Sequence, residues 1–333
     1  MGTTMNVPIG GPEAFRRRIA RRHGAAGFDV AIAAARATLD AVRRRGDEAV
    51  LEHVRRFDRP HARRSELYAE RRALERAARR CPPELRDAIG LAYRRIHAYH
   101  RKQRPREIRH RLGGFETLLV AEPLERVGGC VPRGGATSYP STALMIGVPA
   151  QVAGVRELVL CSPMPPDGSL DPALAHAATL VGAVGIYRAG GAGAVGALAF
   201  GTRLLPPVTK IVGPGNIHTT AAKWLVSAQV GIDGLQGPSE LLVVASADAD
   251  PKRIVLDLEA QAEHGGGPFA ALLSEDAGLL RAVARALGAS RVPADAIGLY
   301  RTPSLADALE LAISAAPEHL SLAGRRAERL APR

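Results

Sequence analysis

Two short segments of this sequence combine side chains that could transfer protons or hold a metal ion. Pro317-Glu318-His319-Leu320 sets a carboxylate beside an imidazole, the two side-chain types best suited to proton transfer near neutral pH. Gln261 and His264 lie three residues apart at the end of an expected helix, so both could meet one ion. Taken alone, a Glu–His pair is usually a solvated helix end, and a Gln–His pair is seldom a metal site. A metal here would need further ligands.

Glycine-rich segments form a second group of candidates. Gly237-Pro238-Ser239-Glu240 places a hydroxyl and a carboxylate at the entrance of an apolar strand. Three further turns, Gly128–Pro132, Gly190–Gly193 and Gly213–Asn216, follow expected strands and precede helices, where backbone N–H groups can approach a phosphate. None matches the GxGxxG fingerprint, and tight turns in any α/β protein look similar. The turns alone leave open whether a nucleotide binds.

The elements that must position these residues alternate along most of the chain. Residues 28–59 and 74–103 carry apolar residues at helical spacing among arginines, which predicts a helical, basic N-terminal region. Expected strands are Thr117–Ala121, Glu157–Cys161, Ile186–Ala189, Lys210–Val212, Glu240–Ala245, Phe269–Leu273 and Ile297–Tyr300. Expected helices between them are Pro172–Val181, Thr219–Gln229, Pro251–Glu263 and Ala277–Leu287. This alternation indicates an α/β protein with parallel sheets and crossover helices.

Composition narrows the classes of function. The chain has 333 residues, 46% of them hydrophobic, which is enough for one large or two medium domains. The net charge of +12 comes almost entirely from arginine, and aromatic residues amount to 4%, so no nucleic-acid partner is expected. Cys81, Cys130 and Cys161 form no CxxC pair, which fits a reducing, cytoplasmic compartment. No signal peptide or membrane span is expected.

The motifs become specific when their order is considered, because together they closely resemble the histidinol dehydrogenase family. The resemblance runs from about Phe28 to Leu320. It is carried by Pro123–Gly128, Tyr139-Pro140-Ser141, Gly213–Asn216, Gly231-Ile232-Asp233, Gly237–Glu240, Gln261–His264 and Pro317–Leu320. The resemblance implies two interleaved domains with incomplete Rossmann-like sheets. The first would comprise residues 1–128, including the helical region, and 239–333; the second would comprise residues 129–238.

The resemblance also implies a reaction and the residues that perform it. Members oxidise L-histidinol to L-histidine with two NAD in succession and one zinc per site, and they form homodimers. Carried over by motif, Gln261 and His264 match zinc ligands, and Ser239, Gln261, His264 and His319 match substrate contacts. Glu318 matches the base that activates water, His319 the base that takes the alcohol proton, and Asn216 a contact to NAD. The substrate would be histidinol or a related amino alcohol.

The sequence departs from the family pattern at several positions. Cys130 and Gly193 stand where the family has a tyrosine and a glutamine that contact NAD, and Arg133 interrupts the Val-Pro-Gly-Gly turn. The family continues beyond Pro-Glu-His-Leu with further zinc and substrate ligands and a tail that crosses the dimer, whereas this sequence ends at Arg333. We therefore expect weak binding of NAD and zinc.

Three hypotheses stay open at this point. The chain is an enzyme of the family, or an impaired or repurposed member acting as a binding subunit, or a piece of a longer protein. In the second case another chain could supply the remaining segment.

Overall fold

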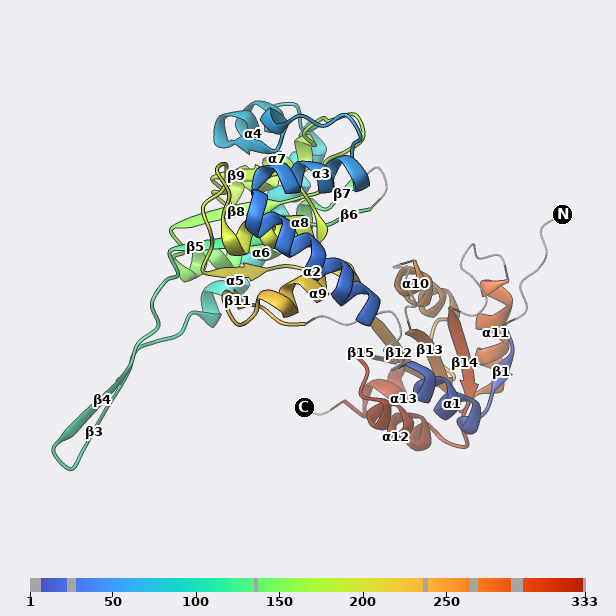
Figure 1. Ribbon diagram of the computed structural model, residues 1–333. Coiled ribbons are helices and arrows are strands. Elements are labelled where there is room, and N and C mark those ends of the chain that lie inside the picture. Colours follow the sequence, from blue (N-terminus) through green and yellow to red (C-terminus); the bar gives the residue numbers. More distant parts are fainter. Residues whose placement is uncertain are drawn as a thin grey trace. The chain divides into compact units, whose positions relative to one another are not determined.

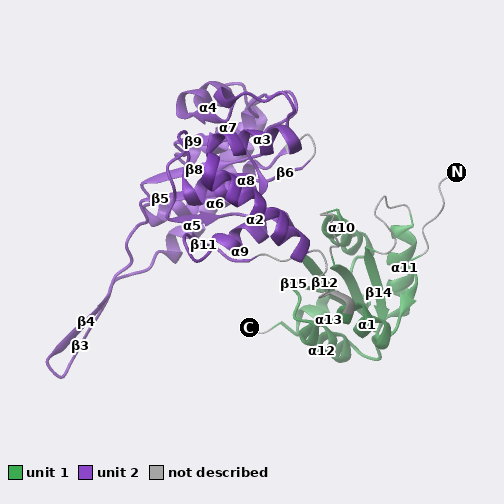
Figure 2. Ribbon diagram, in the orientation of Figure 1, with its two compact units in different colours: residues 1–25, 237–333 green, residues 26–236 purple. Residues whose placement is uncertain are grey.

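The chain folds into two compact units in the computed structural model (Figures 1 and 2). The structure describes residues 7–22, 28–134, 137–235, 239–263, 269–288 and 296–331. Unit 1 comprises residues 1–25 and 237–333, and unit 2 comprises residues 26–236. Unit 1 is therefore assembled from two separate stretches of the chain.

Unit 1 is a parallel sheet covered by helices on both faces. Its strand order is β1-β14-β13-β12-β15, and all four neighbouring pairs are parallel. One face packs against α10 and α11, and the other against α1 and α12. Its elements are β1 (Ile9–Gly10), α1 (Pro12–Arg22), β12 (Glu240–Ala245), α10 (Pro251–Ala262), β13 (Phe269–Ser274), α11 (Ala277–Leu287), β14 (Ile297–Arg301), α12 (Leu305–Ala315), β15 (His319–Ala323) and α13 (Arg325–Glu328).

Local sequence explains why these elements begin where they do. The central strand β13 is buried along its whole length, as expected for a strand covered on both faces. The helices start at side-chain caps: Asp250, Asp276 and Ser304 each accept a hydrogen bond from a first-turn backbone N–H of α10, α11 and α12. Each crossover helix therefore has a defined start at the carboxyl edge of the sheet.

Unit 2 contains a six-stranded sheet of order β11-β10-β5-β8-β9-β2, in which only β2 is antiparallel to its neighbour. Helices α2, α3, α8 and α9 form a core on one face, and α4 to α7 on the other. Its main elements are α2 (Phe28–Arg45), α3 (Asp47–Phe57), β2 (Tyr68–Glu70), α4 (Arg71–Ala78), α5 (Pro83–His100), β5 (Arg126–Cys130), α6 (Pro140–Ala153), β8 (Glu157–Cys161), α7 (Pro172–Leu180), β9 (Gly185–Tyr187), α8 (Gly191–Phe200), β10 (Lys210–Val212), α9 (Ile217–Val226) and β11 (Gly231–Ile232).

Among its described residues, unit 2 also contains two hairpins and two short 3₁₀ helices. The hairpins are β3 (Ile108–Leu112) with β4 (Phe115–Leu119), and β6 (Arg133–Gly134) with β7 (Thr137–Ser138). The 3₁₀ helices span Arg64–Glu66 and Arg101–Gln103. Within the described residues, none of the helices has the length and apolar character needed to cross a membrane.

The α/β class with two largely parallel sheets confirms the sequence-based expectation. The division of the chain differs from the predicted one at one boundary. The predicted boundary at Ser239 lies close to the observed change at Gly237, but the predicted boundary at Gly128 falls inside β5, near the middle of the unit 2 sheet. The helices of the N-terminal region, α2 to α5, pack on that sheet rather than on unit 1. Their apolar faces are buried there, so they belong to unit 2.

Candidate active site

The proton-transfer pair predicted from the sequence lies at the amino edge of the unit 1 sheet. Strands β12 and β15 are parallel neighbours, with Leu241 opposite His319. Glu318 immediately precedes β15, and its Oε2 accepts a hydrogen bond from the backbone N–H of Glu240 at 3.3 Å. The same oxygen lies 3.8 Å from Nε2 of His319. The carboxylate is thus held between a backbone amide and an imidazole.

Ser239 belongs to the same edge, because it immediately precedes β12 as Glu318 precedes β15. The side chains of Glu318 and His319 are 45% and 62% exposed, so small molecules can reach them. A carboxylate that accepts one hydrogen bond keeps lone pairs for a water molecule. The pair can therefore exchange protons with a substrate or with water at this edge.

Gln261 lies in the last turn of α10, which begins after β12 and runs back to the start of β13. The helix therefore ends at the amino edge, where Ser239 and Glu318 also lie. The Gln261 side chain is 8% exposed, and its Nε2 is buried without a hydrogen-bond partner among the described residues. An unsatisfied buried amide costs about 1–3 kcal/mol, so a ligand that engaged it would be favoured.

The structure describes one of the two zinc ligands expected from the sequence, Gln261. The unpartnered atom of Gln261 is the amide nitrogen Nε2, which donates hydrogen bonds, whereas a metal ion would bind the carbonyl oxygen of the same amide. His264 lies outside the described residues. Within the described part of the chain, no group of three His, Cys, Asp or Glu side chains could hold a metal ion. Gln261 would therefore act with His264 and additional ligands, since zinc takes at least three protein ligands.

A second candidate site lies at the carboxyl edge of the unit 2 sheet. Cys130 ends β5, Asn216 follows β10, and Gly193 lies in the first turn of α8. Asn216 caps α9: its Oδ1 accepts hydrogen bonds from the backbone N–H groups of His218 at 3.1 Å and Thr219 at 3.0 Å. The residue is exposed, so its side-chain amide faces the surface at a helix N-terminus.

The loop that carries Asn216 is fixed by an ion pair whose lysine is buried. Lys223, whose side chain is 3% exposed, pairs with Asp233 and donates a hydrogen bond to the Gly213 carbonyl at 3.1 Å. Asp233 in turn accepts a hydrogen bond from the Gly213 N–H at 2.7 Å. Gly213 has a φ of +105°, and a Cβ there would lie 2.4 Å from the Cys130 carbonyl oxygen. Only glycine allows this close approach to β5.

The two departures from the family pattern have structural counterparts. Cys130 is 7% exposed and belongs to an apolar cluster, and burial raises the pKa of its thiol to about 11. Gly193 is covered by His53 of α3: a Cβ at position 193 would lie 2.9 Å from Cδ2 of that imidazole. Burial, followed by the charge of Arg56, lowers the pKa of His53 to about 4. His53 therefore presents a neutral ring beside the turn.

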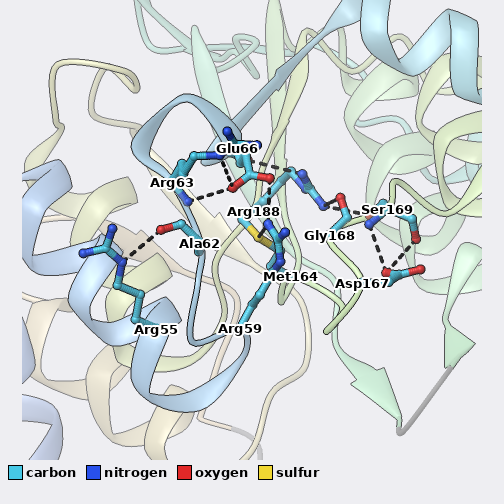
Figure 3. A network of polar contacts seen from close by, with 10 residues as sticks. All are labelled: Arg55, Arg59, Ala62, Arg63, Glu66, Met164, Asp167, Gly168, Ser169 and Arg188. Carbon is cyan, nitrogen blue, oxygen red and sulfur yellow. Dashed lines mark hydrogen bonds and ion pairs between the residues drawn. The ribbon is translucent and has the colours of Figure 1, made fainter.

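The loop that follows β8 is held by a second buried cation, Arg188 (Figure 3). Its guanidinium donates hydrogen bonds to the carbonyls of Gly168 and Ser169, both at 2.7 Å, and to that of Glu66 at 3.4 Å. Arg59 pairs with the Glu66 carboxylate at 2.6 Å. These contacts fix the wall of a nearby cavity.

That cavity has a volume of about 310 Å³ and opens near the carboxyl ends of β5, β8 and β9. Ser138 lies in its wall; it is 4% exposed, and its Oγ is buried without a hydrogen-bond partner among the described residues. The walls include Arg133, Ser138, Ser162, Asp167, Leu174 and Arg188. The mixture of two hydroxyls, two arginines, a carboxylate and apolar side chains suits a small polar ligand.

Comparisons with known proteins agree with the order of the motifs. The sequence model of histidinol dehydrogenase matches residues 23–333. The chain belongs to the histidinol dehydrogenase family. The histidinol dehydrogenase of Rhodopseudomonas palustris is 43% identical over 302 residues, which cover 87% of this chain and 70% of that protein. The one from Saccharolobus solfataricus is 39% identical over 284 residues, covering 85% and 70%.

The fold agrees with a solved member of the histidinol dehydrogenase family. The crystal structure of histidinol dehydrogenase from Elizabethkingia anophelis superposes with a TM-score of 0.84 at 28% identity, covering 99% of this chain and 78% of that chain. Three residues of possible function, His53, Ser138 and Lys223, were not singled out from the sequence. Their spacing carries no signal, because each acts through neighbours that are distant along the chain.

Proposed function

We propose that this chain carries out the NAD-dependent oxidation of L-histidinol, or of a related amino alcohol, to the amino acid. The observation that carries the proposal is the Glu318–His319 pair, held at the amino edge of the unit 1 sheet by the Glu240 amide. Family membership supports it, because relatives about 40% identical are histidinol dehydrogenases. Three buried free cysteines support a reducing, cytoplasmic place of action.

The first oxidation requires one base. His319 would accept the hydroxyl proton while the carbinol carbon transfers hydride to the nicotinamide, which gives the aldehyde, NADH and one proton on the imidazole. In the second oxidation, Glu318 would take a proton from water as its oxygen attacks the aldehyde carbon. The resulting hydrate anion would pass hydride to a second NAD, and its remaining hydroxyl proton would leave to solvent, which gives the carboxylate. General bases of this kind contribute about 10²–10⁴ in rate.

Substrate orientation would depend on the neighbouring residues of the same edge. Ser239 would contact the substrate at the start of β12, and Gln261 and His264 would hold zinc. When bound, zinc supplies a Lewis acid that grips the imidazole and amine of an amino alcohol. The unpartnered Nε2 of Gln261 supports a hydrogen bond to an acceptor atom of the substrate next to α10.

The dinucleotide would bind at the carboxyl edge of the unit 2 sheet. Asn216 would contact its nicotinamide nucleotide, and His53 would form the polar surface over Gly193. Cys130 would contribute through its backbone, since its thiol is buried. The cavity beside Ser138 and Arg133 would receive another part of the dinucleotide, because it lies at the same edge and has room for a ring system.

Steady-state and single-turnover kinetics with histidinol and with its aldehyde test this proposal. His319→Ala should lower oxidation of the alcohol by about 10²–10⁴, and Glu318→Gln should lower oxidation of the aldehyde by a similar factor. With the aldehyde as substrate, His319→Ala should lose less rate than Glu318→Gln. Absence of NADH formation by the zinc-loaded wild-type chain with any amino alcohol would overturn the proposal.

A binding role without turnover is the second candidate function. It is favoured by Cys130, whose thiol is buried, and by Gly193, whose face is covered by His53. Such a chain would bind an imidazole amino alcohol without reducing NAD. Calorimetry with histidinol, in the presence and absence of zinc, separates the two functions: binding with no NADH formed supports this role.

A further inference from the structure

The imidazole of His53 occupies the space that a side chain at position 193 would need. His53 lies in α3 and Gly193 in the first turn of α8, and both helices pack against the same core of unit 2. A Cβ at position 193 would lie 2.9 Å from Cδ2 and 3.0 Å from Cγ of the ring, and one at position 191 would lie 3.3 Å from its Nε2. The ring therefore takes the place in which the glutamine of the family pattern would begin.

The His53 ring offers hydrogen-bonding groups of the same kind as a glutamine amide. Burial, followed by the charge of Arg56, lowers the pKa of His53 to about 4, so the ring is neutral at neutral pH. A neutral imidazole has one N–H donor and one nitrogen that accepts. The backbone of Gly190 receives the donor, because this hydrogen bond raises the pKa. Among the described residues, the second nitrogen is left as an acceptor beside the glycine turn.

The ring also lies near the first turn of α9, which belongs to the proposed nucleotide edge. The charge of His218 contributes to the lowered pKa of His53, so the two imidazoles are close enough to interact. His218 follows Asn216 by two residues, and its backbone N–H donates to Oδ1 of Asn216 at 3.1 Å. Asn216 is the residue that the family resemblance matches to a contact with NAD. His53 and Asn216 therefore lie in one region of the carboxyl edge of unit 2.

We propose that His53 replaces the missing glutamine as a contact to NAD, with its acceptor nitrogen receiving an N–H of the nicotinamide carboxamide. The inference rests on the proposed function, because it takes NAD to bind at this edge of unit 2. A neutral imidazole and a glutamine amide can both accept such a hydrogen bond. Gly191 favours the contact, since a side chain at that position would cover Nε2 of the ring. His53 would orient the nicotinamide ring and favour dinucleotides that carry a carboxamide.

Calorimetry on the full chain tests the contact with NAD and with its acetylpyridine analogue, in which a methyl group replaces the carboxamide NH₂. The wild type should bind NAD about fivefold to tenfold more tightly than the analogue, the worth of one hydrogen bond. His53→Phe keeps a ring beside Phe57, whose centroid lies 4.8 Å from that of His53, but removes the acceptor. This variant should bind NAD as weakly as the analogue. His176→Phe, in α7 on the other face of the sheet, is the matched control and should keep the preference.

Exchange of the two side chains gives a second test. His53→Ala should weaken NAD binding by about fivefold to tenfold, and adding Gly193→Gln should restore both the affinity and the preference for NAD, because the glutamine then has room. Equal NAD affinities of the wild type and His53→Phe would overturn the inference, as would a double variant that binds no more tightly than His53→Ala or a wild type that binds no NAD. Binding that depends on His53, with no NADH formed from any amino alcohol, would contradict only the proposed function.

Discussion

The imidazole of His53 lies against the Cα of Gly193, where the sequence offers no side chain of its own. A Cβ at position 193 would meet Cδ2, Cγ and Cβ of His53 at 2.9, 3.0 and 3.4 Å. Gly193→Gln should therefore destabilise the chain by about 1–3 kcal/mol through overpacking. Adding His53→Ala should recover most of this loss and tighten NAD binding relative to Gly193→Gln alone.

Urea unfolding and calorimetry measure both effects. Gly90→Gln provides the control, because Gly90 also lies in a helix but a Cβ there meets only the flexible end of Arg94, at 3.5 Å. Gly90→Gln should lower the free energy of unfolding by less than about 1 kcal/mol, or should raise it, because glycine is a poor helix former. Equal destabilisation by both substitutions would show that His53 does not restrict position 193.

Two half-buried titratable groups, His53 of α3 and Asp58 at its C-terminus, should give opposite responses to pH. Burial lowers the pKa of His53 to about 4, below its ordinary 6.5. Between pH 4 and 6.5 this imidazole is therefore protonated in the unfolded chain but neutral in the folded chain. This contribution to stability is lost as pH falls from about 6.5 to 4. Burial raises the pKa of Asp58 to about 6, above its ordinary 3.8, so its contribution is lost as pH rises through 4 to 6.

Single variants reveal the two responses, which partly cancel in the wild type. The loss of unfolding free energy caused by His53→Gln should be larger at pH 7 than at pH 4.5. As pH rises from 4.5 to 7, Asp58→Asn should become more stable relative to the wild type. Each change should be on the order of 2 kcal/mol. Unfolding free energies at the two pH values check this, and parallel pH profiles for all three proteins would rule it out.

At the scale of elements, β5 shows where sequence patterns are insufficient. Gly128 and Gly129 predict a turn, yet both lie in an inner strand of the unit 2 sheet. A Cβ at these positions would meet Leu198 of α8 at 2.4 Å and Ile146 of α6 at 2.7 Å. The covering helices fill the space that strand side chains normally occupy. The turn preference of these glycines is therefore overridden by packing that only the fold reveals.

Elements with regular apolar runs were predicted well, because local burial decides them. Strands β8, β10 and β12 and helix α11 have the predicted bounds. The pairing of β12 with β15, which joins Ser239 to Glu318, could not be read from spacing, since it depends on strand order. The family resemblance predicted that Ser239 and Glu318 belong to one site. His53 and Ser138 were not predicted, because only the packing of the folded chain brings them to their sites.

The β10–α9 loop should depend on the Lys223–Asp233 pair. Among the described residues, Asp233→Ala would leave the buried ammonium of Lys223 with only the Gly213 carbonyl as partner, which should cost about 3–5 kcal/mol. Lys223→Met combined with Asp233→Ala should cost less than the sum of these two single changes. Both single variants should weaken NAD binding through Asn216. Denaturant unfolding and NAD titration measure these effects, and additive losses would contradict the coupling.

At the scale of the whole molecule, the apolar cores follow the two units. Among the described residues, three buried clusters are made only of unit 2 side chains and two only of unit 1 side chains. Unit 1 nevertheless depends on both ends of the chain, because Phe15 of α1 packs edge-on against Tyr300 of β14 at a centroid distance of 5.2 Å. Deletion of α1 should therefore affect unit 1 selectively.

Separate cores predict separate unfolding transitions. Leu198 of unit 2 and Leu242 of unit 1 are both fully buried, and truncation of either to alanine should cost about 2–5 kcal/mol in its own unit. Differential scanning calorimetry should resolve two transitions, with Leu198→Ala lowering the temperature of one by several degrees and Leu242→Ala lowering the other. Saturating NAD should raise only the transition that Leu198→Ala lowers, because the proposed nucleotide edge belongs to unit 2. One transition that both variants shift equally would show that the units unfold together and that their cores are energetically coupled.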